Sequence, residues 1–152
     1  EIDAQVQSGT ALAEAALATM QTWRAAGQQI PGYGHPLHKA RDARVDALFE
    51  VARAAGTDLR FIAIAEAVES LLPQVLGKAL KLNVSGAIPA VLLGAGFPAQ
   101  ALRGVPILAR TAGLIAHLFE EINDPIGFAL SYQATREAVY EGEVPAGFGA
   151  HR

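Results

Sequence analysis

Helix-forming segments, interrupted by glycine and proline, run along this chain and limit the folds open to it. Alanine and leucine supply much of the 51% apolar content, and runs of β-branched residues are few. Such a composition favours helices over strands. Apolar residues recur at helical spacing in several segments, and no stretch shows the alternation typical of a half-buried strand. The sequence therefore predicts an all-α fold.

Capping and breaking residues set the expected helix bounds. Gly27 is typical of a helix C-terminus, and Asp42 and Asp58 are typical N-caps. Pro73 marks a helix end or a kink. We expect an unbroken first helix over residues 2–26, helices over 43–55, 59–72, 87–93 and 107–121, and one short helix near Ala134.

Charge and composition exclude several classes of function. The formal net charge of −3 gives no overall basic bias toward nucleic acid. The absence of cysteine removes thiolate metal sites and cysteine nucleophiles, and the four histidines show no zinc-ligand spacing. No window reaches the roughly 20 apolar residues of a membrane span. We expect a cytoplasmic protein without metal, nucleic acid or membrane partners.

The first candidate site is the segment IPGYGHPLHK, residues 30–39. Glycines and a proline shape a tight turn that exposes backbone N–H groups and presents His35 as a hydrogen-bonding group. Arg44 falls in the first turn of the next expected helix, where a basic residue opposes the helix dipole unless an anion is bound. The pattern favours an anionic carbonyl compound or a nucleotide, and the alternative is a plain linker with an exposed histidine. His38 is assigned no role.

A second candidate segment is KALKLNVSGA, residues 78–87. Lys78 and Lys81 are spaced to hold a phosphate. Either Asn83 or Ser85 caps the helix that follows, and capping is the favoured role for Ser85. A serine without a histidine nearby in the sequence gives no indication of a nucleophile.

The third candidate is Arg110, which lies in the apolar segment LARTAGLIAH, residues 108–117. A buried arginine needs a carboxylate partner, which here is Glu66, Glu69 or a substrate carboxylate, with a structural partner favoured. His117 is interpreted as a core histidine. The acidic group Glu120, Glu121 and Asp124 is interpreted as a solvated helix end.

Taken together and in order, these motifs resemble the citrate synthase superfamily. The resemblance rests on IPGYGHPLHK with Asp42-Ala43-Arg44, on LNVSGAI at residues 82–88 and on ARTAGLIAH at residues 109–117. The tail NDPIGF at residues 123–128, with Tyr140-Glu141-Gly142 beyond it, looks most like the citryl-CoA lyase branch, which includes the citryl-CoA-cleaving module of ATP-citrate lyase. The resemblance spans most of the chain from residue 30 onward.

The resemblance implies roles for particular residues. His35 would hydrogen-bond the keto oxygen of oxaloacetate or the citryl hydroxyl, and Arg44 and Arg110 would bind substrate carboxylates, which reverses the structural interpretation of Arg110. The phosphates of coenzyme A would lie near Lys39, with Lys81 a looser candidate. The adenine of coenzyme A would be held by the backbone of Gln29, Ile30, Pro31, Gly32, Tyr33 and Gly34.

The resemblance also implies a domain arrangement and shows two departures. Residues 1–101 would form a small CoA- and substrate-binding domain, residues 102–152 would be a helix and arm of a large domain, and the protein would be a homodimer. Ser85 occupies the position of the family's catalytic aspartate, and a hydroxyl cannot replace a carboxylate that removes the α-proton of a thioester. The family's second catalytic histidine belongs to a segment upstream of residue 1.

We therefore expect a citrate synthase-like or citryl-CoA lyase-like protein. Its reaction would make or break the carbon–carbon bond between acetyl-CoA, or a related acyl-CoA, and oxaloacetate, with citryl-CoA as the joined species. One alternative is a homologue that binds a CoA thioester or a dicarboxylate without catalysis, which Ser85 would explain. Another is a purely structural helical domain, which leaves His35, Arg44 and Arg110 unexplained.

Overall fold

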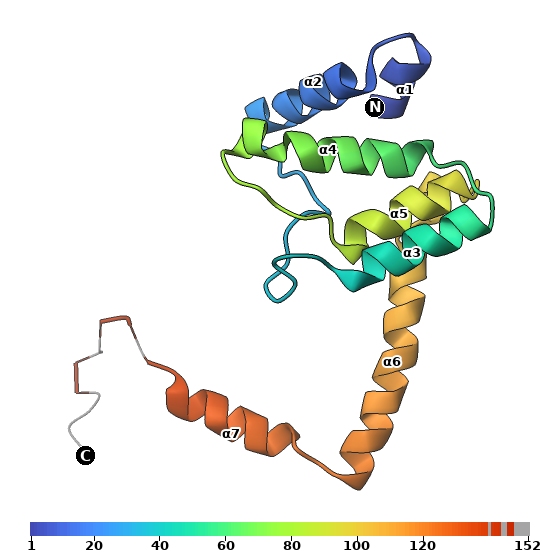
Figure 1. Cartoon of the computed structure of the whole chain (residues 1–152). Coiled ribbons are helices and arrows are strands. Elements are labelled where there is room, and N and C mark those ends of the chain that lie inside the picture. The colour runs from blue at the N-terminus through green and yellow to red at the C-terminus, as the bar shows by residue number, and fades with distance from the viewer. Residues whose placement is uncertain (140, 144–145, 148–152) are drawn as a thin grey trace. The chain divides into compact units, whose positions relative to one another are not determined.

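The computed structural model describes residues 1–139, 141–143 and 146–147, so Tyr140 of the tail motif lies outside the described residues. Among these residues it contains no strand, and Tyr33 and Leu82 form an isolated antiparallel bridge. The predicted all-α fold is confirmed. The helices are α1 Ile2–Gln7, α2 Leu12–Ala25, α3 Ala43–Ala54, α4 Arg60–Leu76, α5 Val84–Gly94, the 3₁₀ turn η1 Ala99–Ala101, α6 Gly104–Asn123 and α7 Gly127–Glu137 (Figure 1).

The chain divides into two compact units, Glu1–Ile107 and Leu108–Arg152. This division groups residues by their contacts and leaves open which parts belong to a small or a large domain. The expected boundary between residues 101 and 102 therefore stays a prediction.

Helix α4 forms the centre of the first unit. It packs against α2 on one side and against α5 on the other, and α3 packs against α5 (Figure 1). The short helix α1 contacts α2 and α4. The link from α2 to α3 carries the first motif identified in the sequence, and the link from α4 to α5 leads into the second motif, which continues into α5.

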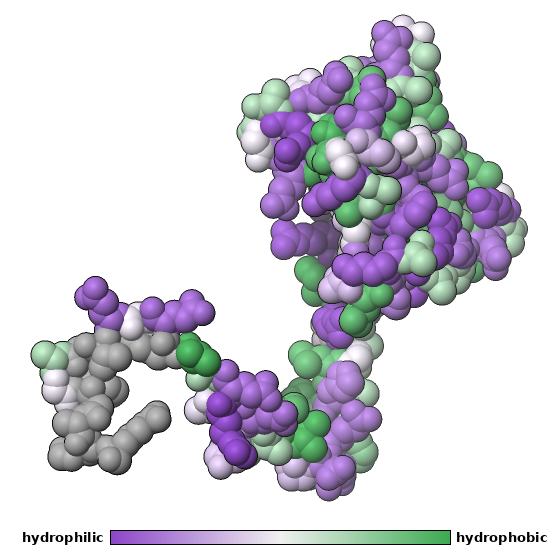
Figure 2. Space-filling view, turned by 60° about the vertical axis from the view of Figure 1, so that its left-hand side comes forward, coloured by the Kyte–Doolittle hydropathy of each residue, from purple (hydrophilic) through white to green (hydrophobic). Residues whose placement is uncertain are grey.

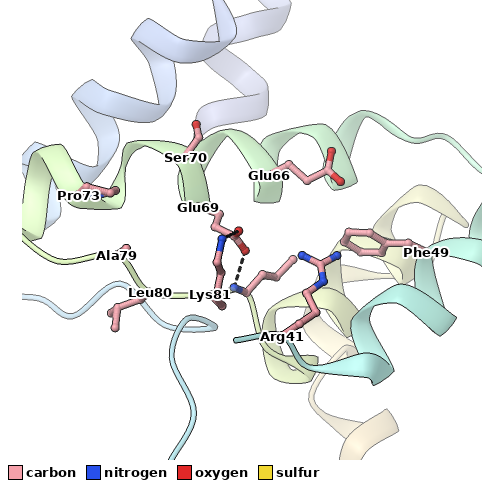
Figure 3. A pocket seen from close by; sticks show the side chains of 10 residues that line it. Arg41, Phe49, Glu66, Glu69, Ser70, Pro73, Ala79, Leu80 and Lys81 are labelled. Atoms are coloured by element: carbon pink, nitrogen blue, oxygen red, sulfur yellow. Dashed lines mark hydrogen bonds and ion pairs between the residues drawn. The ribbon is translucent and has the colours of Figure 1, made fainter. Parts of the chain in front are cut away.

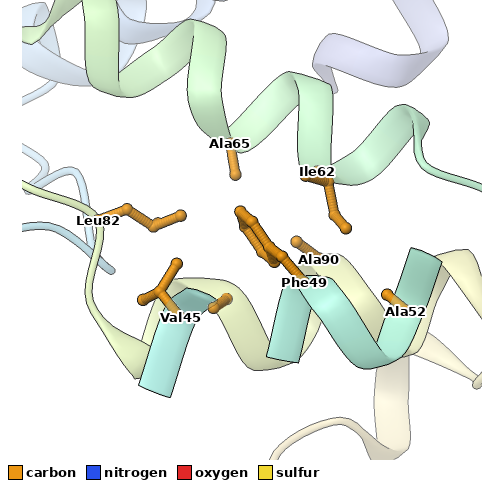
Figure 4. Close-up of a cluster of buried hydrophobic side chains, with 8 residues drawn as sticks. Val45, Phe49, Ala52, Ile62, Ala65, Leu82 and Ala90 are labelled. Carbon is orange, nitrogen blue, oxygen red and sulfur yellow. The ribbon is translucent and has the colours of Figure 1, made fainter. Parts of the chain in front are cut away.

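Two hydrophobic clusters form the core of the first unit. The first surrounds Phe49, which extends from α3 toward α4 and α5 (Figure 4). The second joins α2 to α4 through Met20 and Leu72. Tyr33, from the irregular link after α2, packs against both clusters. The link that carries the first motif is therefore fixed to the core at this residue.

The prediction of one unbroken helix over residues 2–26 is wrong. Helix α1 ends at Gln7, and Gly9 adopts a left-handed φ of +103° before α2 begins at Leu12. The Ser8 hydroxyl donates to the carbonyl of Gln5 over 2.8 Å, a local bond that competes with continuation of the helix. The break lets α1 turn back and contact α2.

Helix α4 continues through Pro73 to Leu76, beyond the end expected at Leu72. Proline removes one backbone donor from the ladder. The helix ends instead at Gly77, which adopts a left-handed φ of +68°. The predicted cap Asp42 is confirmed at α3. At α4 the N-cap position is Leu59, and Asp58 acts from one residue further back, where its carboxylate accepts from the N–H of Arg60.

The second unit consists of the greater part of α6, the helix α7 and the residues that follow. The short helix expected near Ala134 is confirmed as α7. Neither α6 nor α7 contains a buried residue. Green hydrophobic surface alternates with purple hydrophilic surface along these helices (Figure 2). In the described part of the chain, no helix combines the length and the hydropathy needed to cross a membrane.

Candidate functional site

The turn that carries His35 is hydrogen-bonded to the segment that precedes α5. The N–H of Asn83 donates to the carbonyl of Gly32 over 2.9 Å, and the N–H of Gly34 donates to the carbonyl of Lys81 over 2.7 Å. The Asn83 side-chain amide adds a bond of 2.7 Å to the carbonyl of Gly34. The structure thus joins two motifs that lie about 50 residues apart in the sequence.

Two glycines allow this close approach. A Cβ atom built on Gly32 would lie 2.8 Å from the Cα of Gly86, and one built on Gly86 would lie 2.8 Å from the carbonyl oxygen of Gly32. Gly32 also adopts a φ of +91°, a conformation that side chains disfavour. Both positions therefore require glycine for the turn to contact α5.

Of the two predicted caps of α5, Asn83 is confirmed, and the capping role favoured for Ser85 is wrong. The Asn83 Oδ1 atom accepts from the N–H of Ser85 at 2.9 Å and from the N–H of Gly86 at 3.4 Å. Asn83 is extended and stands directly before the helix, as a cap requires, whereas Ser85 already lies inside the first turn. The Ser85 side chain is consequently left exposed beside the His35 turn.

His35 is oriented by the backbone that follows it. Its Nδ1 atom accepts from the N–H of Leu37 and from the N–H of His38, each at 3.1 Å. An imidazole that accepts at Nδ1 carries its proton on Nε2 in the neutral form. The half-buried His35 can therefore donate one hydrogen bond to a ligand through Nε2. The ring of His38 lies beside it, with 4.5 Å between the ring centroids.

Arg44 is held by Asp42 in a bidentate pair. The Nε and Nη2 atoms of Arg44 each donate to a different oxygen of Asp42 over 2.9 Å. The same carboxylate accepts from the N–H of Val84 at 3.0 Å, which ties the start of α3 to the start of α5. The guanidinium of Arg44, helped by the backbone N–H groups of Val84 and of Arg44 itself, holds the pKa of Asp42 well below its usual range despite burial.

A hollow of about 300 Å³ lies next to the turn. Backbone and small side chains of the turn and of the first turn of α5 form one wall, with Gly32 and Ser85 on opposite elements. Apolar side chains of α4 and α5 form the rest, including Phe61 and Leu93. The hollow can accept an apolar or aromatic group next to exposed backbone. We call it the turn hollow.

A second hollow, of about 400 Å³, lies between α4 and the segment before Leu82 (Figure 3). Lys81 points into it and pairs with Glu69 over 3.1 Å. Glu69 also accepts from the N–H of Leu82 at 2.6 Å. Because this carboxylate neutralises Lys81, it weakens the lysine as a phosphate ligand.

The structure brings some of the predicted site residues together within the first unit. His35, Arg44 and Ser85 all lie on segments that Asn83 and Asp42 connect. Gln29 and Lys39 are exposed, whereas Ile30 packs against the second core cluster. Arg110 lies on α6 in the second unit and is exposed, so the premise that it is buried is wrong.

Two further interpretations at α6 are corrected. His117 is exposed and lies 3.0 Å from Glu120, so it is not a core histidine. Glu121 is more than a solvated helix end, because its carboxylate accepts from the N–H groups of Ile126 and Gly127 at 3.1 and 2.9 Å. These two bonds lower the pKa of Glu121.

Sequence reasoning missed the structural roles of Asp42 and Tyr33 at this site. Asp42 was expected to cap α3, but its contact with Val84 joins residues far apart in the sequence and has no local signal. The Tyr33 hydroxyl donates to the carbonyl of Ala65 over 2.9 Å, and burial raises its pKa, with Glu69 adding to the effect. Within the described residues, no group of three or more acidic or histidine side chains is arranged to hold a metal ion.

Comparison with known proteins gives consistent results. Residues 4–127 match the family model described as citrate synthase, C-terminal domain. The structure is similar to that of citryl-CoA lyase from Hydrogenobacter thermophilus, with a TM-score of 0.68 and 31% identity, over 95% of this chain and 55% of the lyase. The sequence is 35% identical over 113 residues to ATP-citrate synthase beta chain protein 2 of Arabidopsis thaliana, covering 62% of this chain and 18% of the plant protein.

The chain therefore spans about half the length of the lyase and about a fifth of the plant protein. The family match covers most of the chain and includes the His35 turn, Asn83, Ser85 and Arg110. This chain belongs to the citrate synthase family.

Proposed function

We propose that the complete protein is a citryl-CoA lyase-like enzyme that acts on the carbon–carbon bond of citryl-CoA, yielding or consuming acetyl-CoA and oxaloacetate. The observation that carries this proposal is that hydrogen bonds join the His35 turn to the segment that leads into α5, beside the turn hollow. It supports the proposal because the turn and the α5 motif belong to one site only if they are in contact.

The four-carbon acid would be bound by charge-assisted hydrogen bonds. In its neutral form His35 offers an Nε2–H to the keto or hydroxyl oxygen of the substrate. Arg44, with a side chain 53% exposed, has five N–H donors, and Asp42 accepts from two of its side-chain nitrogens. We assign Arg110 the role of a second carboxylate ligand, as the resemblance implies. Planar guanidinium groups suit dicarboxylates.

Coenzyme A would bind along the turn. We place its adenine against the backbone of residues 29–34, where the turn hollow offers both polar backbone and apolar side chains. Lys39, which is exposed, is the proposed phosphate ligand. Lys81 is a weaker ligand because Glu69 already neutralises it.

Ser85 favours a second candidate function. An exposed serine stands at the family's aspartate position, and its hydroxyl is no base at neutral pH. The protein would then bind a CoA thioester or a dicarboxylate without turnover.

The test measures acetyl-CoA and oxaloacetate released from citryl-CoA by the complete protein, with wild type and Ser85→Asp side by side. The substituted residue lies in the first turn of α5, where a carboxylate is favoured by the helix dipole, so the variant should fold. Ser85→Asn is the matched control, because it adds similar bulk without the charge.

Each outcome separates the candidates. Turnover by wild type supports the lyase, and a strong rise with Ser85→Asp alone identifies position 85 as a degenerate catalytic position. No turnover by wild type, with thermal stabilisation by coenzyme A and oxaloacetate, supports the binding homologue. No turnover and no stabilisation by either ligand would contradict both.

A further inference from the structure

The chain contains the same short motif twice, and the two copies differ in burial and in their further contacts. Asp42-Ala43-Arg44 begins α3, and Asp58-Leu59-Arg60 begins α4. In both, the aspartate accepts from the backbone N–H of the arginine and pairs with its Nε atom over 2.9 Å. The local arrangement of aspartate and arginine is therefore shared.

Burial and long-range contact distinguish the first copy. The side chain of Asp42 is 2% exposed, whereas that of Asp58 is 48% exposed. Asp42 also accepts from the N–H of Val84 at the start of α5, in addition to three bonds from Arg44. A buried carboxylate with four donors is fixed in position, because moving it would leave buried polar groups unpaired.

We propose that Asp42 is the positioning residue of the dicarboxylate site: it holds the Arg44 guanidinium in one orientation relative to the first turn of α5, which carries Ser85. The proposal rests on the proposed function for the assignment of Arg44 as a carboxylate ligand. Asp42 itself touches no substrate.

The geometry of the pair explains how Arg44 keeps its capacity for a ligand. Asp42 occupies the edge of the guanidinium formed by Nε and Nη2. A guanidinium has five N–H groups, so the edge that includes Nη1 still presents donors in a plane that Asp42 fixes. Orienting this edge in advance lowers the entropy lost when the substrate binds.

The test measures oxaloacetate and coenzyme A binding to the complete protein by titration calorimetry, so that it does not depend on turnover. Asp42→Asn keeps the size and one acceptor of the side chain but loses the charge that holds Arg44. We expect the Kd for oxaloacetate to rise roughly tenfold, while the Kd for coenzyme A stays within about twofold of wild type. Asp58→Asn is the matched control and should leave both values unchanged.

A second comparison excludes a general loss of structure. In an Arg44→Ala background, Asp42→Asn should cause no further loss of oxaloacetate affinity, because the group that it positions is absent. Hydrogen exchange at the Val84 amide should be faster in Asp42→Asn than in Asp58→Asn, with or without ligand.

The outcomes distinguish the proposal from the proposed function. If wild type binds oxaloacetate and Asp42→Asn binds it as tightly, or if Asp42→Asn also weakens binding in the Arg44→Ala background, the positioning role is overturned. If wild type binds neither ligand, the proposed function fails, and a positioning role for a dicarboxylate fails with it.

Discussion

At the scale of single residues, the site depends on groups that are crowded or buried more than on groups that face solvent. Gly86 and Asp42 bind no ligand in our proposal, and Gly32 offers only backbone to the adenine, yet these three residues set the position of His35 and Arg44. Close packing leaves no space for an added methyl group at either glycine. Substitutions at these supporting positions should therefore disturb the site most.

Replacement of Gly32 tests this directly. Gly32→Ala adds a Cβ 2.8 Å from the Cα of Gly86 at a φ of +91°. We expect a loss of about 3 kcal/mol in the free energy of unfolding, as the sum of left-handed strain and overpacking. Gly27→Ala is the control, because Gly27 has a φ of +72° and no atom within 4 Å of the added Cβ.

Gly27→Ala should lose only about 1 kcal/mol in the free energy of unfolding, because it adds the left-handed strain without the overpacking. Urea denaturation of both variants measures the difference. Equal losses at the two positions would show that the contact between the turn and α5 is not tight in solution.

The depressed pKa of Asp42 makes stability depend on pH. The folded pKa lies below the unfolded value of about 3.9, so the unfolded chain binds more protons as the pH falls. The stabilisation from Asp42 is present above about pH 5 and decreases as the pH falls below about 4 and toward the folded pKa. Asp42→Asn should therefore be less stable than wild type at pH 7, with a smaller difference at pH 3.

Denaturation at pH 7, 5 and 3 measures this dependence. Asp58→Asn again serves as the control, because Asp58 is exposed and should contribute little. If the free energies of unfolding of Asp42→Asn and wild type differ by the same amount at all three pH values, Asp42 is not ionised in the folded protein.

The sequence predicted the roles that depend on a residue's near neighbours in the chain. It missed the roles that depend on contacts between distant segments. The turn residues 30–36 were predicted because glycine and proline act on their own neighbours. Asp42 was predicted as a cap for the same reason. Its bond to Val84 and the bond of Tyr33 to Ala65 each join segments that only the folded chain brings together.

At the scale of elements, the errors concern where helices break and end. The break at Gly9 was hidden because the segment on its C-terminal side is rich in alanine, which fits a helix in any register. Helix α4 passes Pro73 because the contacts of α4 with α2 extend along this part of the helix, with Leu72 and Leu76 in the second cluster. Packing thus overrides the cost of a missing backbone donor.

The start of α7 provides a test at this scale. Glu121 accepts from the N–H groups of Ile126 and Gly127, so it satisfies donors at the beginning of α7 from a position on α6. Glu121→Ala should increase the rate of amide exchange over residues 127–130 several-fold by removing this cap. Glu120→Ala is the control, because Glu120 contacts His117 and not α7.

The effect should also appear in wild type on acidification, since protonation of a carboxylate with a lowered pKa weakens the same two bonds. Amide exchange that is equally fast in both variants would show that the α7 N-terminus does not depend on Glu121.

At the scale of the whole molecule, stability is unevenly distributed between the two units. Both hydrophobic clusters lie within the first unit. The helices α6 and α7 have no buried residue and expose large apolar side chains on the second unit, among them Leu108, Phe119 and Phe128. An amphipathic helix gains most of its stability from packing, so these helices need a covering surface.

This distribution gives the last prediction. A fragment of residues 1–107 should unfold cooperatively on heating, because it keeps both clusters and the hydrogen bonds between the turn and the segment before α5. A peptide of residues 108–152 should have little helix in circular dichroism on its own.

The matched control is a fragment of residues 1–82, which loses α5 and with it Ala87 and Ala90 of the first cluster. That fragment should unfold without a sharp transition, since Phe49 loses one wall of its environment. A cooperative 1–82 fragment, or a 1–107 fragment without a transition, would show that the core does not reside where the packing places it.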